Sequence, residues 1–182
     1  MNILGLCGSL RAGSYNRKLL QVAEKIAVEL GHKSLGEGDL SLPLYNEDID
    51  KPETAPSGVK RLVDLAAQAD IILVASPEYN HSMTGVLKNG LDWLSRGSKP
   101  LKGKVVVLFG ASTGIIGSAR SQIHTRQVLN NLDMFSLAKP EVYVREAATA
   151  FDEQGNLKDP KTAEQLTKLI TETLAFAQKL KG

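Results

Sequence analysis

The chain has 182 residues, the length of one domain with a single sizeable core. Its 22 basic and 20 acidic residues are spread along the sequence without a long run of either, so we expect no nucleic-acid partner. A single cysteine, Cys7, excludes an internal disulfide and is expected in the core. With no leader-like segment and no apolar run of membrane-spanning length, we expect a cytoplasmic protein without membrane insertion.

Strand patterns and helix patterns alternate along the sequence. An apolar run at residues 2–7 predicts the first strand, and residues 14–30 predict a helix that stops at Gly31. Further strands are predicted at residues 33–40, 70–76, 104–110 and 141–145. Further helices are predicted at residues 56–68, 85–95, 118–132 and 160–180. Five strands interleaved with five helices predict an open parallel α/β sheet, with residues 1–182 forming one domain.

Three loops carry the unusual chemistry of this chain. They follow the first, third and fourth predicted strands of the chain, at residues 8–16, 76–85 and 110–117, and are called the first, second and third loops below. In open parallel sheets, ligands bind beside the carboxyl ends of the strands, at the point where the strand order reverses. The three loops are therefore expected to meet and form a ligand site.

The first loop has the composition of an anion-binding turn between a strand and a helix. Free N–H groups and the dipole of the helix attract a phosphate there. Ser9, Ser14 and Asn16 can donate side-chain hydrogen bonds, and Arg11 adds a charged fork. A loop that only turns the chain remains the alternative.

Two common nucleotide motifs fail in the first loop. A triphosphate loop needs Lys and then Ser or Thr after its second glycine, whereas Ser14 and Tyr15 follow Gly13. A dinucleotide fingerprint needs glycine where Leu10 stands. The loop is better suited to a terminal phosphate monoester.

The second and third loops offer backbone groups and a flat side chain. Pro77 and Asn80 allow an irregular backbone, and the ring of Tyr79 can lie against a planar group, although a plain surface turn is the alternative. The third loop contains the pattern G-x-S-x-G around Ser112, but a hydrolase also needs an acid and then a histidine downstream. Only His124 follows, without an intervening acid, so we reject that assignment. The other histidines, His32 and His81, share no metal-ligand spacing with each other or with acidic pairs, so we expect no metal site. The amides of this loop can hydrogen-bond a heterocycle.

Taken together, these motifs resemble the NADPH-dependent FMN reductase family of flavodoxin-like proteins, and within it the bacterial chromate and quinone reductases. The resemblance extends from the first strand to the closing helix. The resemblance rests on four motifs: Gly8-Ser-Leu-Arg11 with Ser14 and Asn16, Pro77-Glu-Tyr-Asn80, the run from Leu87 to Ser95, and Gly114-Ile-Ile-Gly117. It implies a flavodoxin-like three-layer α/β/α sandwich with a five-stranded parallel sheet in the order 2-1-3-4-5.

The resemblance also implies the roles of the site residues. Ser9, Arg11, Ser14 and Asn16 would hold the FMN phosphate. The isoalloxazine would be lined by Pro77, Glu78, Tyr79 and Asn80, largely through backbone groups, with Ser112 on the ring or ribityl side. Family members are homodimers or homotetramers, and the helices at residues 85–95 and 118–132 are candidates for the contact.

The implied activity is NAD(P)H-dependent reduction of a small-molecule acceptor, such as a quinone or chromate, through bound FMN. The flavin supplies the hydride chemistry, so the missing acid–base residues are expected, and the kinetics should be ping-pong. Three alternatives remain: a reductase that releases reduced FMN to a monooxygenase, a flavodoxin-like electron carrier, and a phosphate-binding module without redox work. The pI of about 8.6 and the 5% aromatic content disfavour a carrier. The natural acceptor and the choice between NADH and NADPH stay open.

Overall fold

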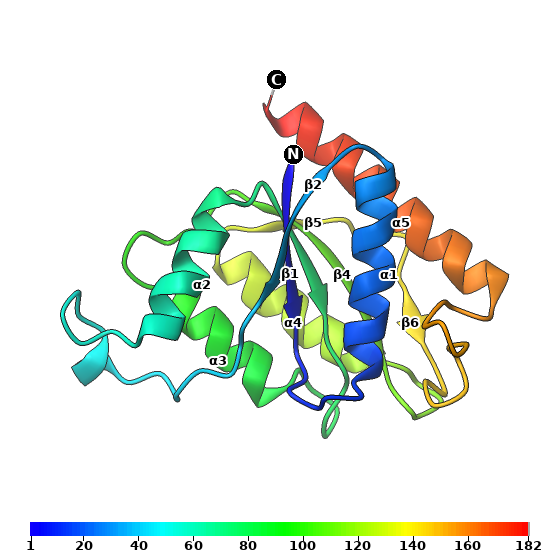
Figure 1. Ribbon diagram of the computed structural model, residues 1–182, viewed down its shortest axis with the longest axis horizontal. Coiled ribbons are helices and arrows are strands. Elements are labelled where there is room, and N and C mark those ends of the chain that lie inside the picture. The colour runs from blue at the N-terminus through cyan, green and yellow to red at the C-terminus, as the bar shows by residue number, and fades with distance from the viewer. Residues whose placement is uncertain (182) are drawn as a thin grey trace.

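The computed structural model describes residues 1–181 and confirms the alternation of strands and helices (Figure 1). The strands are β1 (Asn2–Cys7), β2 (Lys33–Gly38), β3 (Ile71–Ala75), β4 (Val105–Ala111), β5 (Phe135–Ser136) and β6 (Tyr143–Val144). The α-helices are α1 (Tyr15–Glu29), α2 (Ser57–Gln68), α3 (Gly85–Leu94), α4 (Ala119–Asn131) and α5 (Pro160–Lys181). A short 3₁₀ helix, η1 (Glu47–Ile49), lies between β2 and α2. Each predicted helix agrees with the structure to within a residue or two.

The sheet is parallel and has the predicted order, β2-β1-β3-β4-β5. The central strands β1, β3 and β4 are paired in continuous register, as in Ile3 with Ile71 and Ile71 with Val105. Every residue of β3 and β4 is buried, which explains their uninterrupted apolar sequences. Chain order reverses between β1 and β3, which is the switch point where a ligand is expected.

The last strand differs from the prediction of one run at residues 141–145. Two short strands pair with the two ends of β4: β5 pairs with Val105 and Val106, and β6 pairs with Gly110 and Ala111. The segment between β5 and β6 contains Pro140, which has no N–H to donate to a ladder. The sheet therefore has six strands, of which β5 was not anticipated.

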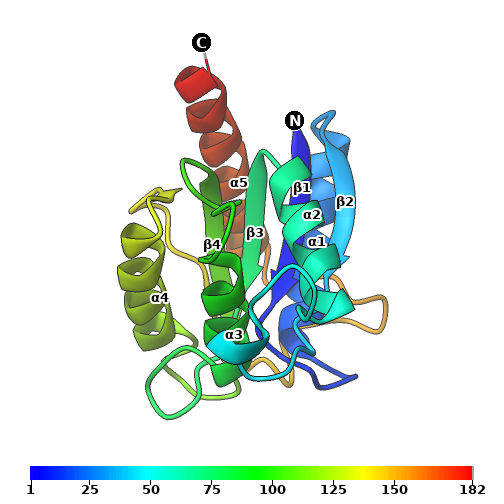
Figure 2. The same cartoon turned by 90° about the vertical axis from the view of Figure 1, so that its left-hand side faces the viewer.

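Two apolar cores fill the space between the sheet and its helices. One core joins α1 and α5 to one face of the sheet, and the other joins α2, α3 and α4 to the opposite face. Figure 2 shows this layering, with α2 and α3 in front of the strands, α4 at the left beside β4, and α5 behind the strands. Among residues 1–181, no helix combines the length and the apolar character needed to cross a membrane.

The layering brings the three loops to one edge of the molecule. In Figure 1 the loops that follow β1, β3 and β4 lie together along the lower edge, whereas the N-terminus and the end of α5 lie at the upper one. The start of α1 belongs to the lower edge, because α1 follows the first loop directly. Ser14 caps α1 there: its Oγ accepts the N–H of Arg17 at 3.3 Å.

Candidate functional site

Hydrogen bonds and close packing tie the three loops to one another. The N–H of Gly8 donates to Ala75 O at 2.8 Å, and the Thr84 hydroxyl donates to Gly8 O at 2.8 Å. The third loop approaches so closely that a Cβ on Gly110 would lie 2.2 Å from the Ser76 carbonyl oxygen. Only glycine fits this position, which explains why β4 ends in glycine and alanine beside the second loop.

A cleft of about 250 Å³ lies where the loops meet. Eight of the nine predicted site residues line it, namely Ser9, Arg11, Ser14, Asn16, Pro77, Glu78, Tyr79 and Ser112. Asn80 is not among the lining residues. Sequence reasoning missed Tyr15, Ala111 and Thr113, which also line the cleft. Tyr15 was considered only as a residue that breaks a triphosphate motif, although an aromatic side chain within an anion-binding loop can also pack against a ligand.

The first loop presents a row of unpaired donors. Within residues 1–181, none of the N–H groups of residues 9–13 has a hydrogen-bond acceptor. The hydroxyl of Ser9 likewise has no partner in this part of the chain, although the residue is 5% exposed and lines the cleft. These groups lie at the start of α1, where the helix dipole adds a positive potential. The loop is thus equipped to bind an anion.

Asn16 has a different geometry from the other loop residues. Its side-chain Nδ2 donates to Ala111 O, and its Oδ1 accepts the N–H of Ala111, both at 2.8 Å. The two residues are 3% and 1% exposed. Asn16 therefore joins the start of α1 to the end of β4, and one N–H of its amide remains for a ligand.

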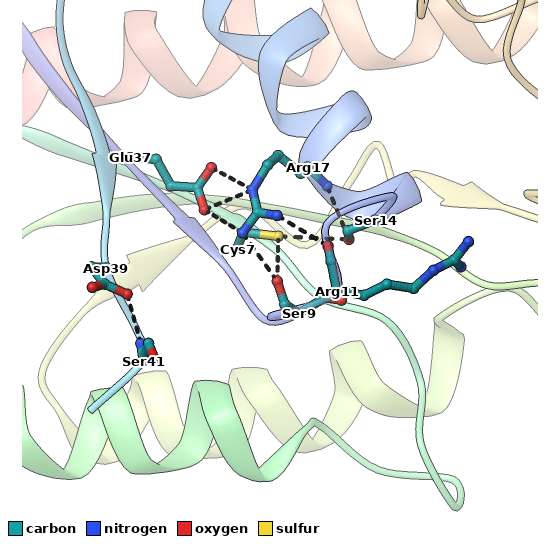
Figure 3. A network of polar contacts seen from close by, with 8 residues as sticks. All are labelled: Cys7, Ser9, Arg11, Ser14, Arg17, Glu37, Asp39 and Ser41. Atoms are coloured by element: carbon teal, nitrogen blue, oxygen red, sulfur yellow. Dashed lines mark hydrogen bonds and ion pairs between the residues drawn. The ribbon is translucent and has the colours of Figure 1, made fainter. Parts of the chain in front are cut away.

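Arg11 is the charged group that is free to meet an anion. Its guanidinium lies over the ring of Tyr15, 5.2 Å from the ring centroid, and makes no hydrogen bond within residues 1–181. In Figure 3 its side chain extends away from the polar network formed by Ser9, Arg17 and Glu37. The positive charge of Arg11 is thus unpaired and exposed beside the cleft.

The second loop contains a tight hairpin at its tip. Tyr79 and Ser82 exchange both backbone hydrogen bonds, at 3.1 and 3.0 Å, around Asn80 and His81. These two residues have φ values of 49° and 64°, the left-handed conformation that Asn tolerates better than His. Asn80 thus helps to form this hairpin through its backbone conformation. The ring of Tyr79, 53% exposed, stands at the mouth of the cleft.

The second loop is also anchored to α4 by two side chains. Glu78 Oε2 accepts the N–H groups of Arg120 and Ser121 at 2.9 and 3.1 Å, so a carboxylate from another loop caps this helix. His124, on α4, is exposed, and its Nδ1 is 2.9 Å from the Ser82 hydroxyl, so it touches the second loop.

The third loop places Ser112 at the edge of the cleft. Its backbone N–H donates to Val144 O at 3.0 Å, so β6 supports the loop, and its hydroxyl is 3.4 Å from the N–H of Gly114. Behind the first loop, Cys7 is 2% exposed and burial raises the pKa of its thiol. Cys7 is thus a neutral core residue, as expected.

Comparisons with known proteins agree with this geometry. Residues 1–149 match the family model described as NADPH-dependent FMN reductase. An NAD(P)H-dependent FMN reductase of Pseudomonas aeruginosa is 43% identical, with 100% of this chain and 98% of that protein covered. A quinone reductase of Escherichia coli K12 is 37% identical, over 100% of this chain and 97% of that protein. Among solved structures, the flavoenzyme NAD(P)H:(acceptor) oxidoreductase FerB of Paracoccus denitrificans superposes with a TM-score of 0.87 at 32% identity, covering 98% of this chain and 97% of that one.

Proposed function

This chain belongs to the NADPH-dependent FMN reductase family, and on that premise we propose that it is an NAD(P)H-dependent flavoenzyme that reduces quinones. The observation that carries the proposal is the first loop, which offers five unpaired N–H groups and an unpaired arginine at the start of a helix. This donor set fits a phosphate monoester, the group at the end of FMN.

The residues present fit the cofactor part by part. The N–H groups of the first loop, the hydroxyls of Ser9 and Ser14, and the guanidinium of Arg11 would hold the phosphate. The second loop would line the flavin ring through the backbone from Pro77 to Asn80, with Tyr79 against one face. Ser112 and the amides around it would face the ring or the ribityl chain. When bound there, FMN would supply the hydride transfer between NAD(P)H and the acceptor.

The protein's own contribution would be to bind the flavin and to orient it toward its reaction partners. The amides of the second and third loops would stabilise negative charge that develops at the edge of the ring. They are held in place by Glu78 at the start of α4 and by Asn16 at the end of β4. The cleft is open, and its lining includes small or exposed residues such as Ala111 and Thr113, which would leave room for a nicotinamide and then for an acceptor.

Further parts of the proposal concern the acceptor range and the assembly. We infer chromate as a further acceptor, a cytoplasmic location without a nucleic-acid partner, and a single FMN-binding domain spanning residues 1–182. We also infer a homodimer or homotetramer, because Ile115, Ile116 and Ile123 are 73%, 40% and 63% exposed near the cleft. Of the apolar side chains on the two candidate helices, Leu87, Leu91, Trp93 and Leu94 are fully buried and belong to the core instead.

The proposal is tested by mixing purified protein with FMN and then adding NADPH or NADH with a benzoquinone. We expect FMN binding, followed by quinone-dependent oxidation of the nicotinamide with the parallel-line kinetics of a ping-pong reaction. Failure of the protein to bind FMN would overturn the proposal. A flavin lost during gel filtration would instead favour the reductase that releases its flavin, and FMN binding without nicotinamide oxidation would favour an electron carrier.

A further inference from the structure

Arg17, the third residue of α1, donates hydrogen bonds to the first loop from the side away from the cleft. Its Nη1 donates to Arg11 O at 3.1 Å, and its Nη2 donates to Ser9 O at 3.3 Å. Figure 3 shows the guanidinium between these two carbonyl groups and the carboxylate of Glu37. One side chain thus binds two alternate carbonyl groups of the loop whose N–H groups are unpaired.

These two contacts help to determine where the neighbouring N–H groups point, together with the N–H of Ser14, which donates to Arg11 O at 3.1 Å, and the thiol of Cys7, which donates to Ser9 O at 3.6 Å. In a trans peptide, the C=O of one residue and the N–H of the next point in opposite directions. Since the carbonyl groups of Ser9 and Arg11 point at Arg17, the N–H groups of Leu10 and Ala12 point away from it. Arg17 therefore orients two of the unpaired donors, although it does not itself line the cleft.

Glu37, in β2, holds the guanidinium in this orientation. Its Oε1 is 3.0 Å from Arg17 Nη2 and 3.1 Å from Nε, and its Oε2 is 3.0 Å from Nε. Hydrogen bonding to Glu37 raises the pKa of Arg17, so the side chain stays charged. The two side chains are 28% and 32% exposed, and an ion pair with this exposure contributes little to stability. The carboxylate also offsets the charge of Arg17, so Arg17 is poorly placed to attract a phosphate by charge alone.

We propose that Arg17, held by Glu37, is a positioning residue that pre-organises the first loop for the phosphate of the cofactor. The inference rests on the proposed function, because it takes FMN as the ligand. Without Arg17, the contacts with the Ser14 N–H and the Cys7 thiol remain, but the peptide groups at residues 9–12 can rotate more freely, and the loop must be ordered further when the phosphate binds. This ordering lowers the affinity for a flavin that carries the phosphate, and it does not affect the affinity for the same ring system without a phosphate.

The test compares FMN with riboflavin, which lacks the phosphate, by fluorescence titration of the full chain. For Arg17→Ala we expect about a tenfold loss of FMN affinity, which corresponds to about 1.4 kcal/mol, with riboflavin affinity unchanged. Arg17→Lys keeps the charge but not the planar fork, so it should lose nearly as much. Glu37→Gln should weaken FMN binding by about two- to threefold. Lys25→Ala is the matched control, because Lys25 lies on α1 in an exposed ion pair with Glu29, away from the loop.

The outcomes distinguish a positioning role of Arg17 from a purely electrostatic or a general structural role. If Arg17→Lys binds FMN as the wild type does, or if Glu37→Gln binds it more tightly, charge alone is at work and the inference is wrong. Equal losses for FMN and riboflavin in Arg17→Ala would show a general structural role and also overturn it. If Arg17→Ala does not fold, the Lys and Gln variants decide. A wild type that binds no FMN overturns the proposed function itself, whereas a wild type that prefers FMN, with Arg17→Ala showing the same preference, overturns only this inference.

Discussion

Replacement of Asn16 by alanine tests how the first and third loops are joined. The substitution removes two hydrogen bonds of 2.8 Å and leaves both the N–H and the C=O of Ala111 without a partner. Ala111 is 1% exposed, so water cannot readily replace the lost amide. A buried polar group left unsatisfied costs about 1–3 kcal/mol, so two such groups predict a loss of about 2–6 kcal/mol. The higher helix propensity of alanine offsets only about 0.5 kcal/mol.

The loss is measurable by urea unfolding. Trp93, the single tryptophan, is 1% exposed in the native state, so its fluorescence reports unfolding, and circular dichroism provides a second probe. A drop of less than about 1 kcal/mol in the free energy of unfolding, well below the range worked out from the unsatisfied groups, would refute the reasoning that this bidentate contact joins α1 to β4.

Replacement of Asn16 by aspartate tests the same contact through the pH dependence of stability. A protonated carboxyl can donate to Ala111 O as the amide does, whereas the ionised form repels that oxygen. The pKa of the new carboxyl is therefore raised in the folded state above its unfolded value of about 4. The destabilisation is absent when both states are protonated, and it grows as the pH rises from the unfolded pKa through the folded one. Urea unfolding at acidic and at alkaline pH should show the larger loss at alkaline pH; a loss independent of pH would contradict the assigned contact.

Three further substitutions test the cleft and the hairpin at the tip of the second loop. Arg11→Ala should weaken FMN binding by about 1.5–3 kcal/mol in a fluorescence titration, at an unchanged melting temperature; unchanged affinity would remove Arg11 from the phosphate site. Ser112→Ala should leave the fold intact and alter the affinity or the reduction potential of the flavin, so identical turnover and potential would exclude its role. His81→Gly should stabilise the chain by about 1 kcal/mol in urea unfolding, because glycine adopts the left-handed conformation without strain. A destabilised His81→Gly variant would show that contacts of the imidazole outweigh that strain.

Local sequence patterns were sufficient to predict most of the fold. The apolar runs of β1, β3 and β4, and the periodicity of the helices, reflect burial that each segment experiences along its own length. Pro56, Gly31 and Ser14 mark helix ends through backbone chemistry that depends only on neighbouring residues. The strand β5 was not predicted because it has only two residues, which is too short for a periodic signal, and β6, also of two residues, lies within the longer strand predicted at residues 141–145.

The sequence by itself therefore determined the order of the elements, and the rule that strands end at one edge placed the three loops together. Only the tertiary structure shows which side chains line the cleft and which hold the loops in place. Asn16 reaches Ala111, Glu78 reaches Arg120, and Arg17 reaches Glu37, and the partners in these pairs are 95, 42 and 20 residues apart. Such pairings depend on which distant segments pack together and on the side-chain rotamers. Neither can be inferred from the spacing of residues along the sequence. For that reason sequence analysis treated Asn16 only as a ligand donor, without its contact with Ala111, and assigned no role to Arg17.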